Sequence, residues 1–239
     1  MKAMRVLRDT GNLTLLQPRG VYGPQGDSYL LRDALMKASV PQGAQVLDVC
    51  TGTGLIAMVA ARLGARRVHA VDTCYRAVLT ARGNARLNRL PVRVEHGDFR
   101  FCRAAGRRYD VVTANPPYVP CPGPGGAARG PARAWDAGPD GRRHLDLLCA
   151  MAPRLLAADG TLLLVHSALC APHRTLRLLG EAGLKASVVA RRRQPFGPVL
   201  TARAAWLAEQ GLIERGQREE DLVVVRADRV PAPGAGGPA

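Results

Sequence analysis

Residues 44–54 read Ala-Gln-Val-Leu-Asp-Val-Cys-Thr-Gly-Thr-Gly, and the small, apolar residues 55–64 follow them. This order predicts a buried strand, a glycine-containing turn and a helix, which is how a βαβ unit begins. Gly52 and Gly54 lack a side chain, so backbone N–H groups there can approach a ligand closely. The stretch therefore predicts a doubly wound α/β fold with a ligand at this turn.

Further predicted strands also end in functional side chains. Asp72 follows the strand 67–71, about 20 residues beyond the glycines, where dinucleotide-binding folds place a carboxylate for a ribose. Asp98 and Phe99 follow the strand 91–96, and Asn115 follows the strand 109–114. Parallel strands present their carboxyl ends at one edge of the sheet, so we expect these side chains to face one crevice together with Asp48.

The sequence Asn115-Pro116-Pro117-Tyr118 indicates the chemistry of that crevice. The prolines fix the backbone, and the Asn115 side chain offers an oxygen that accepts one N–H group and an NH2 group that donates. Tyr118 supplies a flat surface for stacking. A planar nitrogen fits this arrangement: an adenine amino group, a guanine amino group or a glutamine side-chain amide.

An NAD-binding domain is the alternative interpretation of the same fold. The turn has Ala57 where the third glycine of the dinucleotide motif usually stands, although alanine is an accepted variant. NAD also leaves Asn115-Pro116-Pro117-Tyr118 without a role. We therefore favour a methyl-donor site over an NAD site.

Residues 20 to about 226 resemble class I S-adenosylmethionine (SAM) methyltransferases. Within that group they resemble the HemK/PrmC glutamine-N5 methyltransferases of release factors, in the short branch that includes the archaeal and eukaryotic-type enzymes. Besides the Asn-Pro-Pro-Tyr (NPPY) motif, the resemblance is carried by Gly-Val-Tyr-Gly-Pro-Gln-Gly-Asp-Ser-Tyr-Leu-Leu at 20–31, Trp-Asp-Ala-Gly-Pro-Asp-Gly at 135–141, Pro-Phe-Gly-Pro-Val-Leu-Thr-Ala-Arg at 195–203 and Glu-Glu-Asp-Leu-Val-Val-Val-Arg at 219–226. It implies a Rossmann-like, seven-stranded, mostly parallel sheet whose last strand is antiparallel.

The resemblance also implies SAM as the cofactor and a role for each motif residue. The implied cofactor-binding residues are Tyr22, Asp27, Asp48, Cys50, Thr51, Gly52, Gly54, Asp72, Asp98, Phe99 and Asn115, and the implied catalytic residues are Asn115, Pro116, Pro117 and Tyr118. Asp48, Thr51 and the two glycines would surround the methionine moiety, Asp72 the ribose, and Asp98 with Phe99 the adenine. Tyr22 and Asp27 would close the pocket from the N-terminal side.

Cys50 departs from the family pattern, because a glycine usually stands at this position of the turn. Its β-carbon would either crowd the methionine end of the cofactor or fill a gap. For the acceptor, a glutamine of a release factor is the leading expectation. A nucleic-acid adenine-N6 or guanine-N2 amine and a small molecule remain as alternatives, and a small activating subunit is a candidate partner because eukaryotic relatives bind one.

Charge and composition narrow the class of protein. The net charge of +15 suggests an anionic partner such as nucleic acid or the ribosome, with Arg191-Arg192-Arg193 as one candidate contact. Arginine far outnumbers lysine, however, which is typical of a high-GC coding bias. The six cysteines and five histidines lack ligand spacing, so we expect neither a disulfide nor a metal site. No apolar stretch is long enough for a membrane span, and we expect a cytoplasmic enzyme.

The expected organisation is an N-terminal segment at 1–26, a methyltransferase domain at 27–229 and a disordered Pro/Gly tail at 230–239. Asp27 or Ser28 is the expected N-cap of the first helix, and the Gly/Pro-rich loop 121–130 is the expected mobile lid. Helices are predicted near 27–39, 54–64, 75–88, 141–157, 171–182 and 199–210, and strands near 45–49, 67–71, 91–96, 109–114, 160–166, 184–192 and 221–227.

Overall fold

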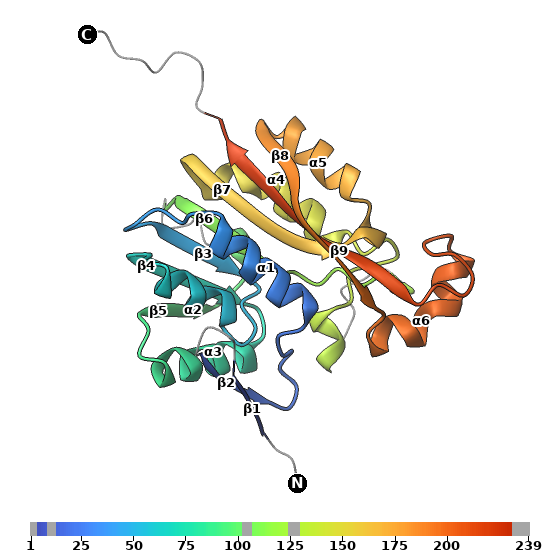
Figure 1. Cartoon of the computed structure of the whole chain (residues 1–239), viewed down its shortest axis with the longest axis horizontal. Helices are drawn as coiled ribbons and strands as arrows, with labels where there is room; N and C mark the ends of the chain where they lie inside the picture. The colour runs from blue at the N-terminus through green and yellow to red at the C-terminus, as the bar shows by residue number, and fades with distance from the viewer. Residues whose placement is uncertain (1–3, 9–12, 102–106, 124–129, 231–239) are drawn as a thin grey trace.

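The computed structural model describes residues 4–8, 13–101, 107–123 and 130–230 (Figure 1). In chain order the elements are β1 (Met4–Arg8), β2 (Thr14–Pro18), α1 (Gly26–Lys37), β3 (Gln45–Val49), α2 (Leu55–Arg62), β4 (Arg67–Asp72), α3 (Tyr75–Leu87), β5 (Val92–His96), β6 (Tyr109–Ala114), the 3-10 helix η2 (Gly130–Ala134), α4 (Arg143–Leu155), β7 (Leu156–Ser167), the 3-10 helix η3 (Ala168–Cys170), α5 (Pro172–Glu181), β8 (Leu184–Pro195), α6 (Pro198–Glu209) and β9 (Glu219–Arg229).

The main sheet has seven strands in the order β5-β4-β3-β6-β7-β9-β8. Neighbours from β5 to β7 are parallel, whereas β9 runs antiparallel to both β7 and β8. Helices cover both faces: α1 packs against α2 on one face, and α4 packs against α5 on the other (Figure 1). The predicted doubly wound, mostly parallel sheet with a reversed last strand is confirmed.

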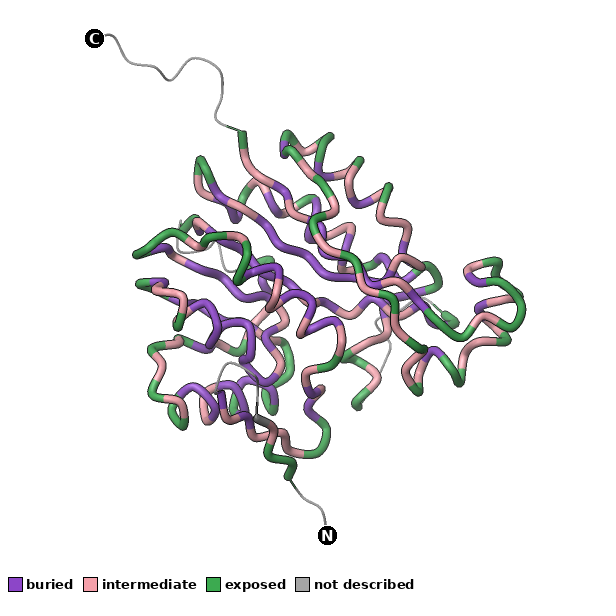
Figure 2. The backbone as a smooth tube through the Cα atoms, in the orientation of Figure 1, coloured by how far each residue is buried: buried purple, intermediate pink, exposed green. Residues whose placement is uncertain are grey.

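The central strands form the core, as the buried colour along them shows (Figure 2). Val46 and Leu47 of β3 and Leu163 and Leu164 of β7 are completely buried. Strands covered by helices on both faces need apolar residues at successive positions, which explains these near-continuous apolar runs. The packed sheet gives the carboxyl ends of β3, β4, β5 and β6 fixed positions relative to one another.

The strands β1 and β2 form an antiparallel hairpin that we did not predict from the sequence. Two asparagine side chains at the C-terminal end of α3 form hydrogen bonds with the backbone of β2. Asn84 accepts from the Leu16 N–H (2.8 Å) and donates to the Leu16 carbonyl (3.0 Å), and Asn88 makes the same pair of bonds with Thr14 (3.0 and 2.8 Å). The hairpin is therefore joined to α3 through two side chains spaced one helical turn apart.

The first helix begins earlier than predicted. The expectation that Asp27 or Ser28 forms its N-cap is wrong, because Gln25 occupies that position and α1 starts at Gly26. The Asp27 side chain lies in the first turn and accepts hydrogen bonds from Ser28 and Tyr118 instead.

Two predictions concern segments that the structure describes only in part or not at all. Most of the expected lid at 121–130 and the Pro/Gly tail from residue 231 lie outside the described residues. Within the described ranges, none of the helices combines the length and the apolar character that crossing a membrane requires.

Candidate active site

A cleft of about 540 Å³ opens at the carboxyl ends of β3, β4, β5 and β6. It brings together almost every residue that the sequence predicted for the site. The predicted residues that line it are Tyr22, Asp27, Asp48, Cys50, Thr51, Gly52, Asp72, Asp98, Phe99, Asn115, Pro116, Pro117 and Tyr118. Gly54 does not line the cleft: a β-carbon there would meet Ala81 of α3 at 3.1 Å, so this glycine permits close helix packing.

Asp48 lies at the floor of the cleft and is 2 % exposed. Its carboxylate accepts hydrogen bonds from the hydroxyl groups of Thr51 (2.6 Å) and Thr113 (2.7 Å). Burial raises the pKa of Asp48 to about 6, because desolvation of the carboxylate outweighs these hydrogen bonds. A buried carboxylate with hydroxyl partners is suited to a cationic ligand.

Asp72, at the end of β4, is held by backbone donors. One carboxylate oxygen accepts from the Gly52 N–H (2.9 Å) and the other from the Cys74 N–H (2.8 Å). Each oxygen keeps a further acceptor position, because a carboxylate has about four in all. The side chain is thus fixed while it can still accept hydrogen bonds from a diol in the cleft.

Cys50 adopts a backbone conformation that favours glycine, with φ of +59°. A residue with a β-carbon pays an energetic cost there, which explains why glycine is usual at this position of the turn. The side chain lines the cleft, and burial raises the pKa of its thiol well above the ordinary value. The thiol is therefore a neutral, weakly polar part of the wall.

The Asn115-Pro116-Pro117-Tyr118 segment also lines the cleft and contacts the first turn of α1. The Asn115 side-chain NH2 group donates to the Ser28 hydroxyl (3.3 Å), and the Tyr118 hydroxyl donates to the Asp27 carboxylate (3.0 Å). Burial, followed by the nearby Asp27 charge, raises the pKa of Tyr118 well above its ordinary value. Tyr118 is therefore a neutral hydrogen-bond donor at working pH.

Several lining residues were missed by the sequence reasoning. They are Ser28, Cys74, Arg76, Arg133, Trp135, Asp136, Arg143 and His144. Trp135 is held at the cleft because its carbonyl accepts from the Val119 N–H (2.7 Å), directly after the Asn115-Pro116-Pro117-Tyr118 segment. The tryptophan stretch at 135–141 was the available signal for this side of the cleft, whereas nothing in the spacing of the arginines or His144 marked them.

The Arg191-Arg192-Arg193 run lies in β8, and none of the three arginines lines the cleft. Each guanidinium is paired with a carboxylate: Arg191 with Asp221 (2.9 Å), Arg192 with Asp33 (3.1 Å) and Arg193 with Glu219 (2.7 Å). Charges paired in this way are poorly placed to bind a polyanion. The structure therefore favours the interpretation of this run as a solvated sheet edge.

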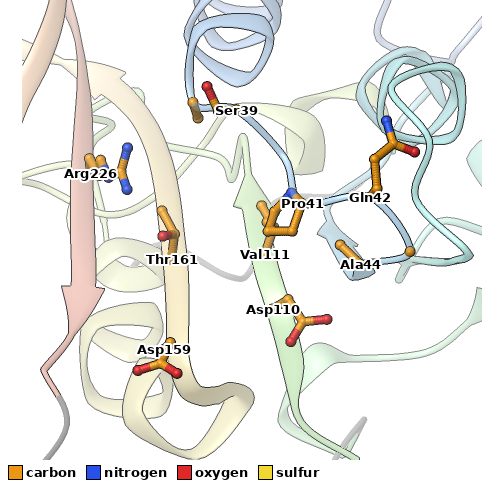
Figure 3. Close-up of a pocket in the computed structure, with 11 residues that line it drawn as sticks. Ser39, Pro41, Gln42, Ala44, Asp110, Val111, Asp159, Thr161 and Arg226 are labelled. Carbon is orange, nitrogen blue, oxygen red and sulfur yellow. The ribbon is translucent and has the colours of Figure 1, made fainter.

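A second cavity, of about 390 Å³, lies at the amino ends of β3 and β6 (Figure 3). Two of its three charged side chains have partners, since Asp110 accepts from the Gln45 N–H (2.8 Å) and Arg226 is paired with Asp228 (2.9 Å). Ligands of open parallel sheets bind outside the carboxyl ends of the strands, so the first cleft is the candidate active site.

Comparisons with known proteins agree with this geometry. The chain is 32 % identical over 184 residues to a putative protein N5-glutamine methyltransferase of Methanocaldococcus jannaschii, covering 77 % of this chain and 91 % of that protein. It is 31 % identical over 184 residues to methyltransferase HEMK2 of Mus musculus, covering 73 % and 85 % of the two chains. The chain belongs to the HemK family of methyltransferases.

Two further comparisons describe the fold of this HemK-family chain. The family description "Ribosomal protein L11 methyltransferase (PrmA)" matches residues 33–116, which contain the glycine turn and Asn115. The solved Mtq2–Trm112 complex of E. cuniculi, which is responsible for methylation of the termination factor eRF1, aligns with a TM-score of 0.59 and 22 % identity. That alignment covers 88 % of this chain and 99 % of the other, and it supports the shared fold.

Proposed function

We propose that the protein transfers a methyl group from SAM to the side-chain amide nitrogen of a glutamine in a release factor. The supporting observation is one cleft that combines carboxylates at the ends of β3 and β4 with the Asn115-Pro116-Pro117-Tyr118 wall. The relatives named as protein N5-glutamine methyltransferases support glutamine as the acceptor.

The residues of the cleft fit SAM in charge and in shape. SAM supplies a methyl group on a positively charged sulfur, and its amino acid end carries an ammonium group. The buried Asp48 carboxylate is a suitable partner for this positive charge. Gly52 adds space, since a β-carbon built there has only the Tyr22 carbonyl, at 3.7 Å, as a near neighbour. Asp72 would bind the ribose, and Asp98 with Phe99 would bind the adenine.

The acceptor amide needs help because its nitrogen lone pair is delocalised into the carbonyl group. We infer that the Asn115 side-chain oxygen and the Pro116 carbonyl accept hydrogen bonds from its two N–H groups. These bonds raise the electron density on the nitrogen and orient the lone pair toward the methyl group. Methyl transfer is an in-line displacement, so fixing the two reactants in this pose contributes much of the rate acceleration.

Replacing Asn115 tests this function. For Asn115→Ala we expect kcat to fall by roughly 100-fold or more, because both orientation and hydrogen bonding of the acceptor are lost. Cofactor affinity should remain within roughly threefold of wild type if the residue acts mainly on the acceptor. Labelled SAM with a release factor measures turnover, and calorimetry measures cofactor binding. Retention of turnover within a few-fold would contradict the assigned role.

A nucleic-acid amine is a second candidate acceptor, favoured by the charge at the mouth of the cleft. Arg76, Arg133 and Arg143 line the cleft, are exposed and form no ion pair with a carboxylate of the described residues. Incubation with labelled SAM and separate pools of release factor, RNA and DNA distinguishes the acceptors. Label in nucleic acid alone would overturn the release factor assignment.

An activating subunit is proposed by comparison with the Mtq2–Trm112 complex, whose fold this chain shares. Activity of the purified chain by itself measures whether such a subunit is required. Full activity of the isolated chain would exclude an obligatory partner.

A further inference from the structure

We propose that Ser28 is a positioning residue that fixes which way the Asn115 carboxamide faces, and that Asp27 in turn fixes Ser28. This inference rests on the proposed function, because it concerns how Asn115 meets its acceptor. It assigns the first turn of α1 a part in the reaction geometry in addition to closing the cofactor pocket.

The contacts form a continuous chain from the helix to the catalytic segment. The Asn115 NH2 group lies 3.3 Å from the Ser28 hydroxyl oxygen, and that hydroxyl lies 3.0 Å from an Asp27 carboxylate oxygen. The same Asp27 oxygen accepts from the Ser28 N–H at 2.5 Å. Asp27 and Ser28 are 4 % and 8 % exposed, so water competes little with these bonds.

The direction of each bond follows from the number of protons available. A serine hydroxyl has one proton to donate and otherwise accepts, whereas an ionised carboxylate only accepts. Four donors face Asp27: the Ser28 hydroxyl, the Ser28 N–H, the Tyr118 hydroxyl and the Tyr22 hydroxyl. With its proton directed at Asp27, the Ser28 hydroxyl can only accept from Asn115. The NH2 group of Asn115 must therefore face Ser28, and its oxygen must face the other way.

This orientation decides whether Asn115 can act. With the NH2 group held by Ser28, the carboxamide oxygen is free to accept an N–H group of the acceptor. After a flip, the Asn115 NH2 group would meet an N–H group of the acceptor, and two donors would face each other. The flipped form would also place the carboxamide oxygen against a serine oxygen whose proton is already used. Ser28 thus discriminates between a productive and an unproductive form of the same side chain.

Asp27 also positions Tyr118, at the other end of the Asn115-Pro116-Pro117-Tyr118 motif. Its second carboxylate oxygen accepts from the Tyr118 hydroxyl at 3.0 Å. One buried carboxylate therefore holds both Asn115, through Ser28, and Tyr118. Because Asp27 lies in the first turn of α1, the partial positive charge at the helix N-terminus stabilises it there.

Three variants with matched shapes test the positioning role. In Ser28→Ala the hydroxyl is absent, both orientations of Asn115 become accessible, and kcat should fall roughly tenfold. Ser28→Thr keeps the hydroxyl and should retain kcat within about threefold, whereas Ser28→Cys, with a weak acceptor of similar size, should behave like Ser28→Ala. Turnover is measured with labelled SAM and a release factor at saturating cofactor, and cofactor affinity is measured by calorimetry.

A second readout does not depend on the acceptor. In protein labelled with nitrogen-15 and saturated with S-adenosylhomocysteine, loss of a signal in Asn115→Ala identifies the Asn115 side-chain NH2 group. We expect one proton of this group to exchange slowly with solvent in wild type and in Ser28→Thr, and faster in Ser28→Ala. If wild type shows this protection but methylates no release factor, the proposed acceptor fails while the positioning role stands.

Two results would overturn the proposal. One is a Ser28→Ala variant whose kcat stays within about twofold of wild type. The other is an Asn115 NH2 signal with unchanged exchange in Ser28→Ala. A loss of kcat in Ser28→Thr equal to that in Ser28→Ala would also count against it, because the threonine hydroxyl would then fail to rescue.

Discussion

Cys50 carries a backbone cost that a glycine would remove. Its φ of +59° lies in the left-handed region, where a β-carbon costs roughly 1–2 kcal/mol, while glycine loses part of that gain through greater freedom in the unfolded chain. We expect Cys50→Gly to raise the free energy of unfolding by about 1 kcal/mol in urea titrations. Cys50→Ala keeps the β-carbon and should bring no such gain. An equal gain in both variants would assign the effect to the thiol and not to the backbone.

The ionisation of Asp48 makes cofactor binding depend on pH. The folded protein without ligand has a raised Asp48 pKa of about 6, so the carboxylate becomes neutral as the pH falls through this value. SAM is cationic and should bind the ionised form, which predicts that affinity falls below pH 6 by up to about tenfold per pH unit. Calorimetry at several values between about pH 5 and pH 8 measures how the affinity for the cofactor depends on pH.

The raised pKa of Asp48 affects the stability of the ligand-free protein in the opposite direction to cofactor binding. Because the folded pKa of Asp48 is raised, its stabilising contribution is present below the unfolded value and is lost as the pH rises through about 6. Asp48→Asn should remove both pH dependences and bind the cofactor weakly throughout. A pH-independent affinity in wild type would contradict the electrostatic role of Asp48.

Asn84 joins three elements and is completely buried. Its carboxamide bonds both backbone groups of Leu16 in β2 and donates to the Thr53 carbonyl (2.9 Å) in the turn after β3. Asn84→Ala leaves these backbone groups without partners and should lower the free energy of unfolding by roughly 2–4 kcal/mol. Cofactor affinity should fall as well, because the turn loses an anchor.

Asn88, the C-cap residue directly after α3, provides the matched control. It is only half-buried and bonds Thr14, away from the glycine turn. We expect Asn88→Ala to cost about half as much stability and to leave cofactor affinity within about twofold of wild type. Equal effects of the two variants in urea unfolding and calorimetry would contradict the special role of Asn84.

The elements differ in how well the sequence predicted them. The strand that ends at Asp72 and the strand directly before Asn115 were predictable, because apolar periodicity and short local spacing define them. The hairpin β1–β2 was not, since its partners on α3 lie about 70 residues away and bond through side chains. The contact between Ser28 and Asn115 spans 87 positions for the same reason. The local sequence pattern predicts where strands end. Contacts between side chains across the cleft become visible only in the folded protein.

At the scale of the whole molecule, we expect positive charge to act through the arginines that form no ion pair within the described residues. Arg76, Arg133 and Arg143 line the cleft and are exposed, and we expect a variant with alanine at all three positions to raise KM for an acidic acceptor. The effect should shrink as salt increases from about 50 to 500 mM, because screening weakens exposed charges. Initial rates across this series measure it.

Arg193→Ala is the control for this prediction, since Arg193 is already paired with Glu219 at the sheet edge. Its KM and salt dependence should match wild type. A similar rise in KM for Arg193→Ala would mean that net charge, and not its place on the molecule, controls association. Composition alone gave the net charge correctly but directed attention to the arginine run in β8, because ion pairs become visible only after folding.

The antiparallel strand β9 follows β8 in the sequence but lies inside the sheet, between β7 and β8. During synthesis, β7 and β8 therefore leave the ribosomal exit tunnel before β9, the strand that pairs with both of them. A nascent chain that ends before residue 219 exposes unpaired strand edges, which invite aggregation and capture by chaperones or proteases. Closure of the sheet thus waits for the synthesis of β9, so a chain that stops before this strand exposes edges that chaperones and proteases recognise.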